Sequence, residues 1–222
     1  PEPAPTRTGA PLLEQIHEGL TFVRGQRLLF PLFSCIAAAA FAGAGIQVLL
    51  PILVLRTLGM SATQLGVLLS AGALGGILGA ITRSAWITHL GIGRTTVATN
   101  ILGVAILAFQ PAAIHIPAWA TWVIAASGII SSYFLTVYNV TQMSLRQEIC
   151  PPHMLGRMNA IFRFAVWGVM PLGSLASGVA ASWMGVEAAM YVFIFLAVGA
   201  SIAMGLTPAA HIRGTSAINT VP

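Results

Sequence analysis

The sequence predicts an all-α integral membrane protein, a bundle of six transmembrane helices. Of its 222 residues, 57% are hydrophobic and only 7% are charged, and the mean hydropathy is +0.88. Soluble domains carry about 25% charged residues, so this composition excludes soluble, disordered and disulfide-stapled classes. The apolar stretches are continuous and rich in alanine, leucine and glycine, without the period-2 alternation of membrane-spanning strands.

The charged residues divide the chain into five long stretches that carry no charge. A helix needs about 20 apolar residues to cross a hydrocarbon core about 30 Å thick. Four stretches hold one span each, and 95–145 holds two, because Pro111 to Pro117 interrupts the helix. The expected spans are about 29–53, 63–82, 95–112, 117–142, 161–183 and 187–207.

The arginines predict the orientation of these spans. If the N-terminus is cytoplasmic, Arg56 alone lies outside, and the positive-inside bias is satisfied. The arginines then inside are Arg7, Arg24, Arg27, Arg83, Arg94, Arg146, Arg157, Arg163 and Arg213. We therefore expect a multi-pass protein of the cell (plasma or inner) membrane with both termini in the cytoplasm. Because the arginines separate spans and form no basic patch, nucleic acid is not an expected partner.

This topology divides the chain into three regions. Residues 1–27 form a cytoplasmic tail with an amphipathic helix over 12–24, which we expect to lie at the inner membrane surface. Residues 28–207 form the six-span bundle, and residues 208–222 form a cytoplasmic C-terminal tail.

The fourth span has one polar side. At 100° per residue, seven polar residues fall within an arc of about 180°. They are Ser127, Ser131, Ser132, Thr136, Tyr138, Asn139 and Gln142. Polar groups are costly in hydrocarbon, so this arc must face other helices or water. Interhelical hydrogen bonds would explain two or three of the seven, whereas the full set favours a hydrated cavity.

We expect a substrate path along this arc, lined by Gln47 of the first span and by Ser132, Thr136, Tyr138 and Asn139. Gln47 and Asn100 are single amides in otherwise apolar spans, and interhelical hydrogen bonding is the alternative role for both. Arg163 lies near the inner end of the fifth span, where it reaches the headgroups or lines an inner vestibule. Small residues predict close helix packing in the second and fifth spans: Gly72, Gly75, Gly76, Gly79, Gly173, Ser174 and Gly178.

Two short motifs carry a family resemblance. One is Gly91-Ile-Gly93-Arg94, between the second and third spans. The other is Pro151-x4-Gly156-Arg157, followed by Phe162-Arg163-Phe164 and by Trp167-Gly168-x2-Pro171-Leu172-Gly173. This pattern resembles the C-terminal half of major facilitator superfamily permeases, and most closely the branch of enterobactin exporters and macrolide efflux pumps. The resemblance covers about residues 12–207.

The resemblance implies a three-plus-three inverted repeat that forms half of a twelve-helix fold. A second six-helix half would pack against it around a central cavity. The first, second, fourth and fifth spans would line that cavity, and the third and sixth would face lipid. The implied activity is export of small amphipathic molecules, such as drugs or siderophores, by alternating access. The residues implied in the cytoplasmic loops are Arg94, Gly156, Arg157 and Arg163.

The length of the chain adds a further expectation, because it is half that of such a permease. We expect a fragment, one half of a split carrier or one subunit of a homodimer that does not transport alone. No cofactor and no metal are expected.

Three other classes fit six spans less well. An intramembrane serine protease would use Ser127 in Ala126-Ser127-Gly128, but no histidine lies within a span to activate it. The membrane domain of an ATP-driven exporter would extend its helices into the cytoplasm, and the inner loops here are too short. A structural or assembly protein of the membrane is the third alternative.

Overall fold

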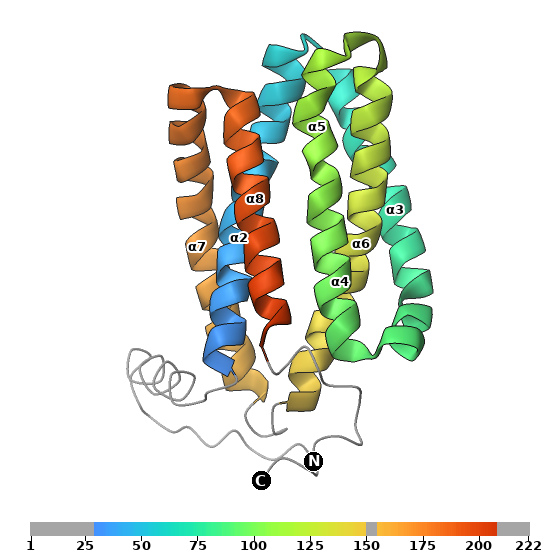
Figure 1. Cartoon of the computed structure of the whole chain (residues 1–222), viewed down its shortest axis with the longest axis vertical. Coiled ribbons are helices and arrows are strands. Elements are labelled where there is room, and N and C mark those ends of the chain that lie inside the picture. Colours follow the sequence, from blue (N-terminus) through green and yellow to red (C-terminus); the bar gives the residue numbers. More distant parts are fainter. Residues whose placement is uncertain (1–28, 150–154, 208–222) are drawn as a thin grey trace, which may run out of the picture.

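The structure, a computed structural model, describes residues 29–149 and 155–207 (Figure 1). Six helical segments in this part of the chain are long and apolar enough to cross a membrane. The predicted six-span, all-α fold is therefore confirmed, and the second to fifth helical segments are longer than the expected spans. The helices are α2 (Leu29–Ile52, continued by a π-helical turn over Leu53–Thr57), α3 (Ala62–Leu90), α4 (Ile92–Ala105), α5 (Phe109–Ala112), α6 (Ala120–Ile149), α7 (Leu155–Met184) and α8 (Val186–Gly205).

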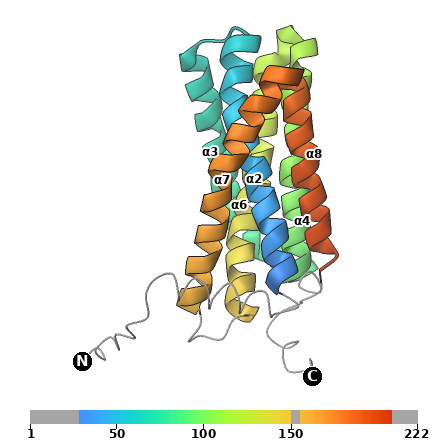
Figure 2. The ribbon, with the colours of Figure 1, turned by 90° about the vertical axis from the view of Figure 1, so that its left-hand side faces the viewer.

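The helices form two three-helix units that lie side by side (Figures 1 and 2). One unit contains α2, α7 and α8, and the other contains α6, α3 and α4; the contact between α4 and α8 joins them. The first three spans (α2, α3 and α4) form one half of the sequence, and the last three (α6, α7 and α8) form the other. In each unit, the first helix of one half packs against the second and third helices of the other: α2 against α7 and α8, and α6 against α3 and α4. Because α2 and α6 run in opposite directions (Figure 1), this exchange has the form of an inverted repeat.

The turns within the two halves repeat the same geometry. Gly91, between α3 and α4, has φ 78° and ψ 163°, and Gly185, between α7 and α8, has φ 85° and ψ 161°. Each glycine donates its N–H to the carbonyl four residues earlier, Ile87 or Ala181. A positive φ is costly for residues with a Cβ, so glycine is the residue that allows a helix-to-helix turn this short.

The segment from Arg83 to Arg94, which lies between the expected second and third spans, is almost entirely helical. The expected span ends were wrong because they follow the apolar stretch of the sequence, whereas the helix extends beyond it. α3 continues beyond its apolar part until Gly91 ends it, and α4 begins at the next residue. The charged side chains at such helix ends reach water without the backbone leaving the helix.

The break between the third and fourth spans lies at one end of the predicted Pro111 to Pro117 interval. Helical turns continue past Pro111, which lies within α5, to His115. The backbone leaves the helix at Ile116, with φ −132° and ψ 63°, immediately before Pro117. Pro111 is tolerated because it is near the start of a short helical segment, where a missing N–H costs little.

The bundle has two ends, named here from Figure 1. The upper end holds the turn before α3, the break at Ile116 and the turn at Gly185. The lower end holds the turn at Gly91, the starts of α2 and α7, and the ends of α6 and α8. The predicted tails 1–27 and 208–222, including the amphipathic helix 12–24, lie outside the described residues.

Glycines of α3 allow the backbones of α3 and α6 to touch. A Cβ on Gly75 would collide with the carbonyl group of Ile129, and one on Gly79 with the carbonyl group of Tyr133. In lipid, helix association depends on such close packing because lipid tails are as apolar as leucine. The predicted packing role is confirmed for both glycines.

The other half of the molecule repeats this contact between α7 and α2. A Cβ on Gly173 would collide with the backbone carbonyl of Phe41. Gly178, in contrast, has open space around its Cβ position, so the predicted close packing does not extend to it. Gly173 in α7 therefore corresponds to Gly79 in α3, and Phe41 in α2 corresponds to Tyr133 in α6.

Asn100 forms an interhelical hydrogen bond in the contact between α4 and α8. Its Nδ2 donates to the Ser201 hydroxyl at 2.9 Å, and that hydroxyl donates to the Ala197 carbonyl at 2.7 Å. Both side chains are buried. The interhelical alternative that the sequence left open for Asn100 is the one the structure shows.

Replacing Ser201 by alanine should therefore destabilise the bundle. The change leaves the buried Asn100 amide without its acceptor, and polar contacts of this kind in membrane proteins are worth about 0.6 to 1.7 kcal/mol. The measurement is unfolding in detergent, with Ser182→Ala as the control because Ser182 is exposed and bonds within its own helix. Equal stability of the two variants would contradict a structural role for this hydrogen bond.

Candidate functional site

Two cavities lie between the three-helix units. The upper cavity, about 460 Å³, is bounded by α2, α3 and α6 and by part of the third span. The lower cavity, about 440 Å³, is bounded by α2, α4, α6 and α7. Both volumes are within the range of about 300 to 1,000 Å³ that small-molecule sites occupy. The residues that line both cavities are Ile46, Gln47, Leu107, Leu135 and Asn139.

The polar side of α6 is divided between these cavities and the neighbouring helices. Ser132 and Thr136 line the upper cavity, and Tyr138 lines the lower one. Asn139 is exposed and lines both. The structure thus brings four predicted path residues of this helix to cavity walls.

The two serines at the start of the arc are held by hydrogen bonds. The Ser131 hydroxyl, although Ser131 also lines the upper cavity, donates to the Gly103 carbonyl of α4 at 2.6 Å. The Ser127 hydroxyl donates to the Ile124 carbonyl of its own helix at 3.1 Å. Ser131 therefore combines the two explanations of the polar arc, interhelical bonding and cavity lining, whereas Ser127 bonds within its own helix.

Tyr138 is anchored at the lower cavity by its surroundings. Its side chain is 8% exposed and packs with Ile36 and Met204. Its hydroxyl accepts a hydrogen bond from Gln142 Nε2 at 3.2 Å. The ring therefore contributes to the core, whereas the hydroxyl belongs to a polar pair at the cavity wall.

Gln47 and Asn139 occupy equivalent positions in the two halves. Gln47 comes six residues after Phe41, and Asn139 comes six residues after Tyr133. Phe41 and Tyr133 are themselves equivalent, because each directs its backbone carbonyl at a glycine of the packed helix. Gln47 and Asn139 are both exposed, and each lines both cavities. The inverted repeat thus places one carboxamide from each half between the two cavities.

Sequence reasoning missed Gln110, a third carboxamide at the upper cavity. Together with Leu107 it brings the third span into the cavity wall, whereas the resemblance implies that this span faces lipid. Gln110 is 2% exposed, and its Oε1 has no hydrogen-bond partner among the described residues. The available signal was a lone amide in an apolar span, and the sequence does not reveal which way it points.

The residues predicted in cytoplasmic loops lie within helices at the lower end. Arg94 is in the first turn of α4, and Gly156 and Arg157 are in the first turn of α7. The prediction of a loop location was therefore wrong for all three, for the same reason as at Arg83. Residues 150–154, which include Pro151, lie outside the described residues.

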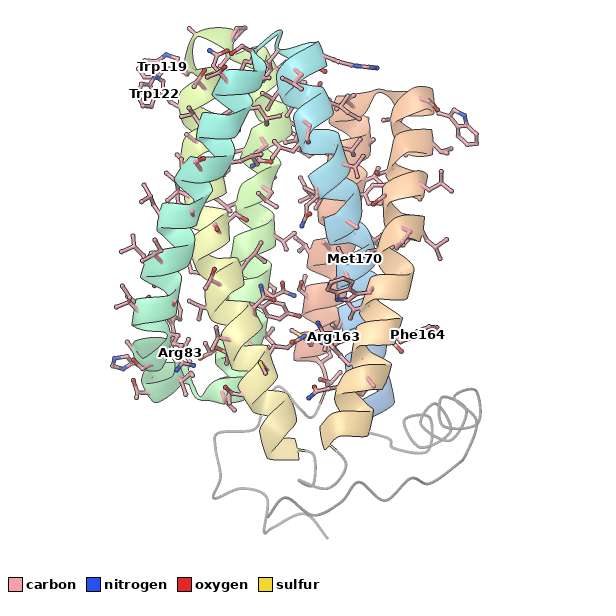
Figure 3. All side chains as sticks on the ribbon, turned by 180° about the vertical axis from the view of Figure 1, so that it is seen from behind. Arg83, Trp119, Trp122, Arg163, Phe164 and Met170 are labelled. Carbon is pink, nitrogen blue, oxygen red and sulfur yellow. The ribbon has the colours of Figure 1, made fainter. Side chains whose placement is uncertain are left out.

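Arg163 lies about two turns above the start of α7. Its guanidinium carbon is 5.8 Å from the ring centroid of Trp167, a cation–π distance, and Trp167 lines the lower cavity. Figure 3 shows Arg163 and Met170 on the side of α7 that faces α6, with Phe164 pointing away. The guanidinium is thus near the lower cavity, although Arg163 is not among its lining residues.

Among the described residues, the Tyr138 phenol is the one ionisable group in the cavity walls. Within the described part of the chain, the polar lining consists of carboxamides and hydroxyls, and no arginine, histidine, aspartate or glutamate lines either cavity. Such walls offer hydrogen bonds without a counter-charge. They suit molecules with an apolar body and a few neutral polar groups.

The six-span bundle, its inverted repeat and its paired cavities define a multi-pass membrane transporter of the major facilitator kind. The chain belongs to the transmembrane secretion effector family, whose model matches residues 7–219. This is a family of transporters and not of enzymes. Searches among curated proteins and among solved structures gave no match.

Proposed function

We propose that the chain is one six-helix half of an efflux permease that exports small amphipathic molecules, such as drugs or siderophores. The branch it resembles contains enterobactin exporters and macrolide efflux pumps. The observation that carries the proposal is the position of Gln47 and Asn139, which border one cavity above them and another below.

This arrangement supports transport by alternating access. Substrate enters the lower cavity near Tyr138, binds between Gln47 and Asn139, and leaves along Ser132 and Thr136 through the upper cavity. Because the two carboxamides are related by the inverted repeat, they offer equivalent hydrogen bonds to each side. Rocking of helices around a fixed midplane site is the general mechanism of such repeats.

The partner in this mechanism is a second six-helix half, either an N-terminal half or a second copy of this chain. Large apolar side chains cover the outward faces of α3 and α7. They include Val67, Leu74, Ile77 and Ile81 on α3, and Phe164, Leu172, Leu175 and Val179 on α7. Faces of this kind suit either the lipid bilayer or another apolar helix.

The arginines support a cytoplasmic lower end. Arg83, Arg94 and Arg163 lie toward that end, and Arg56 lies at the upper one. With the positive-inside bias, they support our proposal that both chain termini are cytoplasmic. We propose the plasma or inner membrane as the location. We propose that Arg94 and Arg157 help to set this topology.

The test is accumulation of a macrolide and of a catecholate siderophore in bacterial cells that lack other efflux pumps. The chain is produced alone or together with any six-span polypeptide encoded directly upstream of it. We expect lowered accumulation only when both halves are present. Unchanged accumulation in every case would contradict export, and lowered accumulation with this chain alone would rule out the need for an upstream half and leave a second copy of the chain as the partner.

A further inference from the structure

We propose that the lower cavity has an anion-binding site at its lower edge, where Arg163 binds the acidic group of an amphipathic molecule and Trp167 packs against its apolar body. The inference rests on the proposed function and narrows its substrate class, because it selects acids over neutral molecules and bases. It also gives a role to a charged side chain that lines neither cavity.

The first observation is the side of α7 on which Arg163 lies. Residues three, four and seven positions apart share one side of a helix. Val166, Trp167 and Met170 follow Arg163 at these intervals, and all three line the lower cavity. Figure 3 shows Arg163 on the same side of α7 as Met170, facing α6, whereas Phe164 points away. Arg163 therefore lies one turn below the lining residues, at the lower edge of the cavity.

The second observation is the contact between Arg163 and Trp167. The guanidinium carbon lies over the Trp167 ring, 5.8 Å from its centroid. An arginine can stack its planar face on an aromatic ring while its N–H donors, which lie in that plane, stay free to bind a carboxylate. Trp167 is 66% exposed, so its ring also has open surface for a ligand. An apolar body against this ring thus brings an attached acidic group within reach of the guanidinium.

The third observation is that the Arg163 guanidinium has no carboxylate partner among the described residues. The ion pair in that part of the chain joins His115 and Glu187, at the upper end of the bundle. An arginine binds a carboxylate through two parallel N–H···O bonds, which are among the strong hydrogen bonds of proteins. Because the described cavity lining is neutral apart from its hydroxyls and carboxamides, the ligand's charge is best placed at this edge while its apolar body enters the cavity.

A lipid headgroup is the competing partner, because arginines near the end of a span can reach the phosphate layer. Both partners offer an anionic oxygen to the guanidinium. The position of Arg163 on the side that faces α6 favours a ligand in the cavity. Lipid composition distinguishes the two, since a headgroup bound at Arg163 would compete with a soluble acid.

The experiment uses three dyes that share one aromatic fluorophore: dansylglycine is an acid, dansylamide is neutral and dansylcadaverine is a base. Binding is measured by dye fluorescence with the full chain in nanodiscs of phosphatidylcholine, with and without phosphatidylglycerol, after subtraction of empty nanodiscs. The variants are Arg163→Gln, Arg163→Lys and Trp167→Leu. The matched control is Arg83→Gln, which removes an exposed arginine of α3 that lines neither cavity.

We expect the unmodified protein to bind dansylglycine more tightly than the other two dyes. Arg163→Gln should weaken dansylglycine about tenfold, the effect of a hydrogen bond to a charged group, and leave dansylamide unchanged. Arg163→Lys should lose less because it keeps the charge. Trp167→Leu should weaken all three dyes, because it removes the ring against which their shared body packs. Arg163 is exposed, so Arg163→Gln should unfold at the same temperature as the unmodified protein.

Equal loss for dansylglycine and dansylamide, no loss for either, or an equal effect of Arg83→Gln would overturn the proposal. If the difference between the unmodified protein and Arg163→Gln disappears in nanodiscs with phosphatidylglycerol, a headgroup is the partner and the proposal is also overturned. If Asn139→Leu abolishes export while Arg163→Gln changes no dye affinity, this inference fails and the proposed function stands. If the dyes respond as expected while accumulation is unchanged in every strain, the anion site stands and export fails.

Discussion

Replacing Gly75 by valine is expected to prevent assembly of the native bundle. The Cβ alone would overlap the carbonyl group of Ile129, and the two methyl groups of valine add further bulk. Because the obstacle is backbone and not a side chain that can change rotamer, α3 and α6 must move apart. Overpacking typically costs about 1 to 3 kcal/mol, and a clash with backbone belongs at the upper end of that range.

The control for this prediction is on the same helix. Gly66 also lies within α3, but a Cβ there meets no atom within 4 Å. Gly66→Val should therefore retain a monodisperse elution profile and a normal unfolding temperature in detergent, whereas Gly75→Val should lose both. Similar behaviour of the two variants would show that backbone contact between α3 and α6 does not stabilise the fold.

The second large effect is expected at the paired carboxamides. Replacing Gln47 or Asn139 by leucine removes hydrogen bonds to substrate while leaving an apolar side chain of similar size. We expect each change to lower export at least about tenfold, which corresponds to about 1.4 kcal/mol. Both side chains are exposed, so neither change removes a buried contact. The amount of folded protein should therefore stay unchanged.

Export by these variants is compared with export by Gln64→Leu, which makes the same chemical change to an exposed amide outside both cavities. Equal effects of Gln47→Leu and Asn139→Leu would support a site that uses both halves of the repeat equally. Full activity of either variant, at normal protein levels, would contradict the proposed position of the substrate between them.

The spans were predictable because their cause is local. A stretch without charge that is long enough to cross the bilayer forms a helix whatever its neighbours, since backbone hydrogen bonds must be satisfied within it. The extent of the helices was less predictable. Arg83 and Arg94 mark where apolar sequence ends, but the helices end at Gly91, where the backbone adopts a positive φ.

The site was predictable only in part because it depends on which side of each helix faces a neighbour. The polar arc of α6 was visible at 100° per residue, yet Ser131 bonds to α4 while its neighbour Ser132 lines the cavity. Gln110 was missed for a related reason. Two 3₁₀ segments flank α5, and their three residues per turn shift the angular positions that a regular α-helix would predict.

The relation between Gln47 and Asn139 also needed three dimensions. The two segments share little sequence, and their equivalence emerges from the glycine contacts at Phe41 and Tyr133 and from the matched turns at Gly91 and Gly185. In the sequence, the Gln47 amide is therefore an isolated feature, whereas in the structure it forms a pair with the Asn139 amide.

Cysteine accessibility along α6 is the most direct test of a wet path between the two units. Single cysteines replace Ser132, Asn139, Val137 and Ile130 in a background carrying Cys35→Ser and Cys150→Ser. They are exposed to a charged, membrane-impermeant thiol reagent in intact membranes. Val137 is 0% exposed, and Ile130 is 41% exposed but lines neither cavity. We expect the cysteines at 132 and 139 to react and those at 137 and 130 to stay unmodified; the reverse pattern would contradict a water-filled route along this helix.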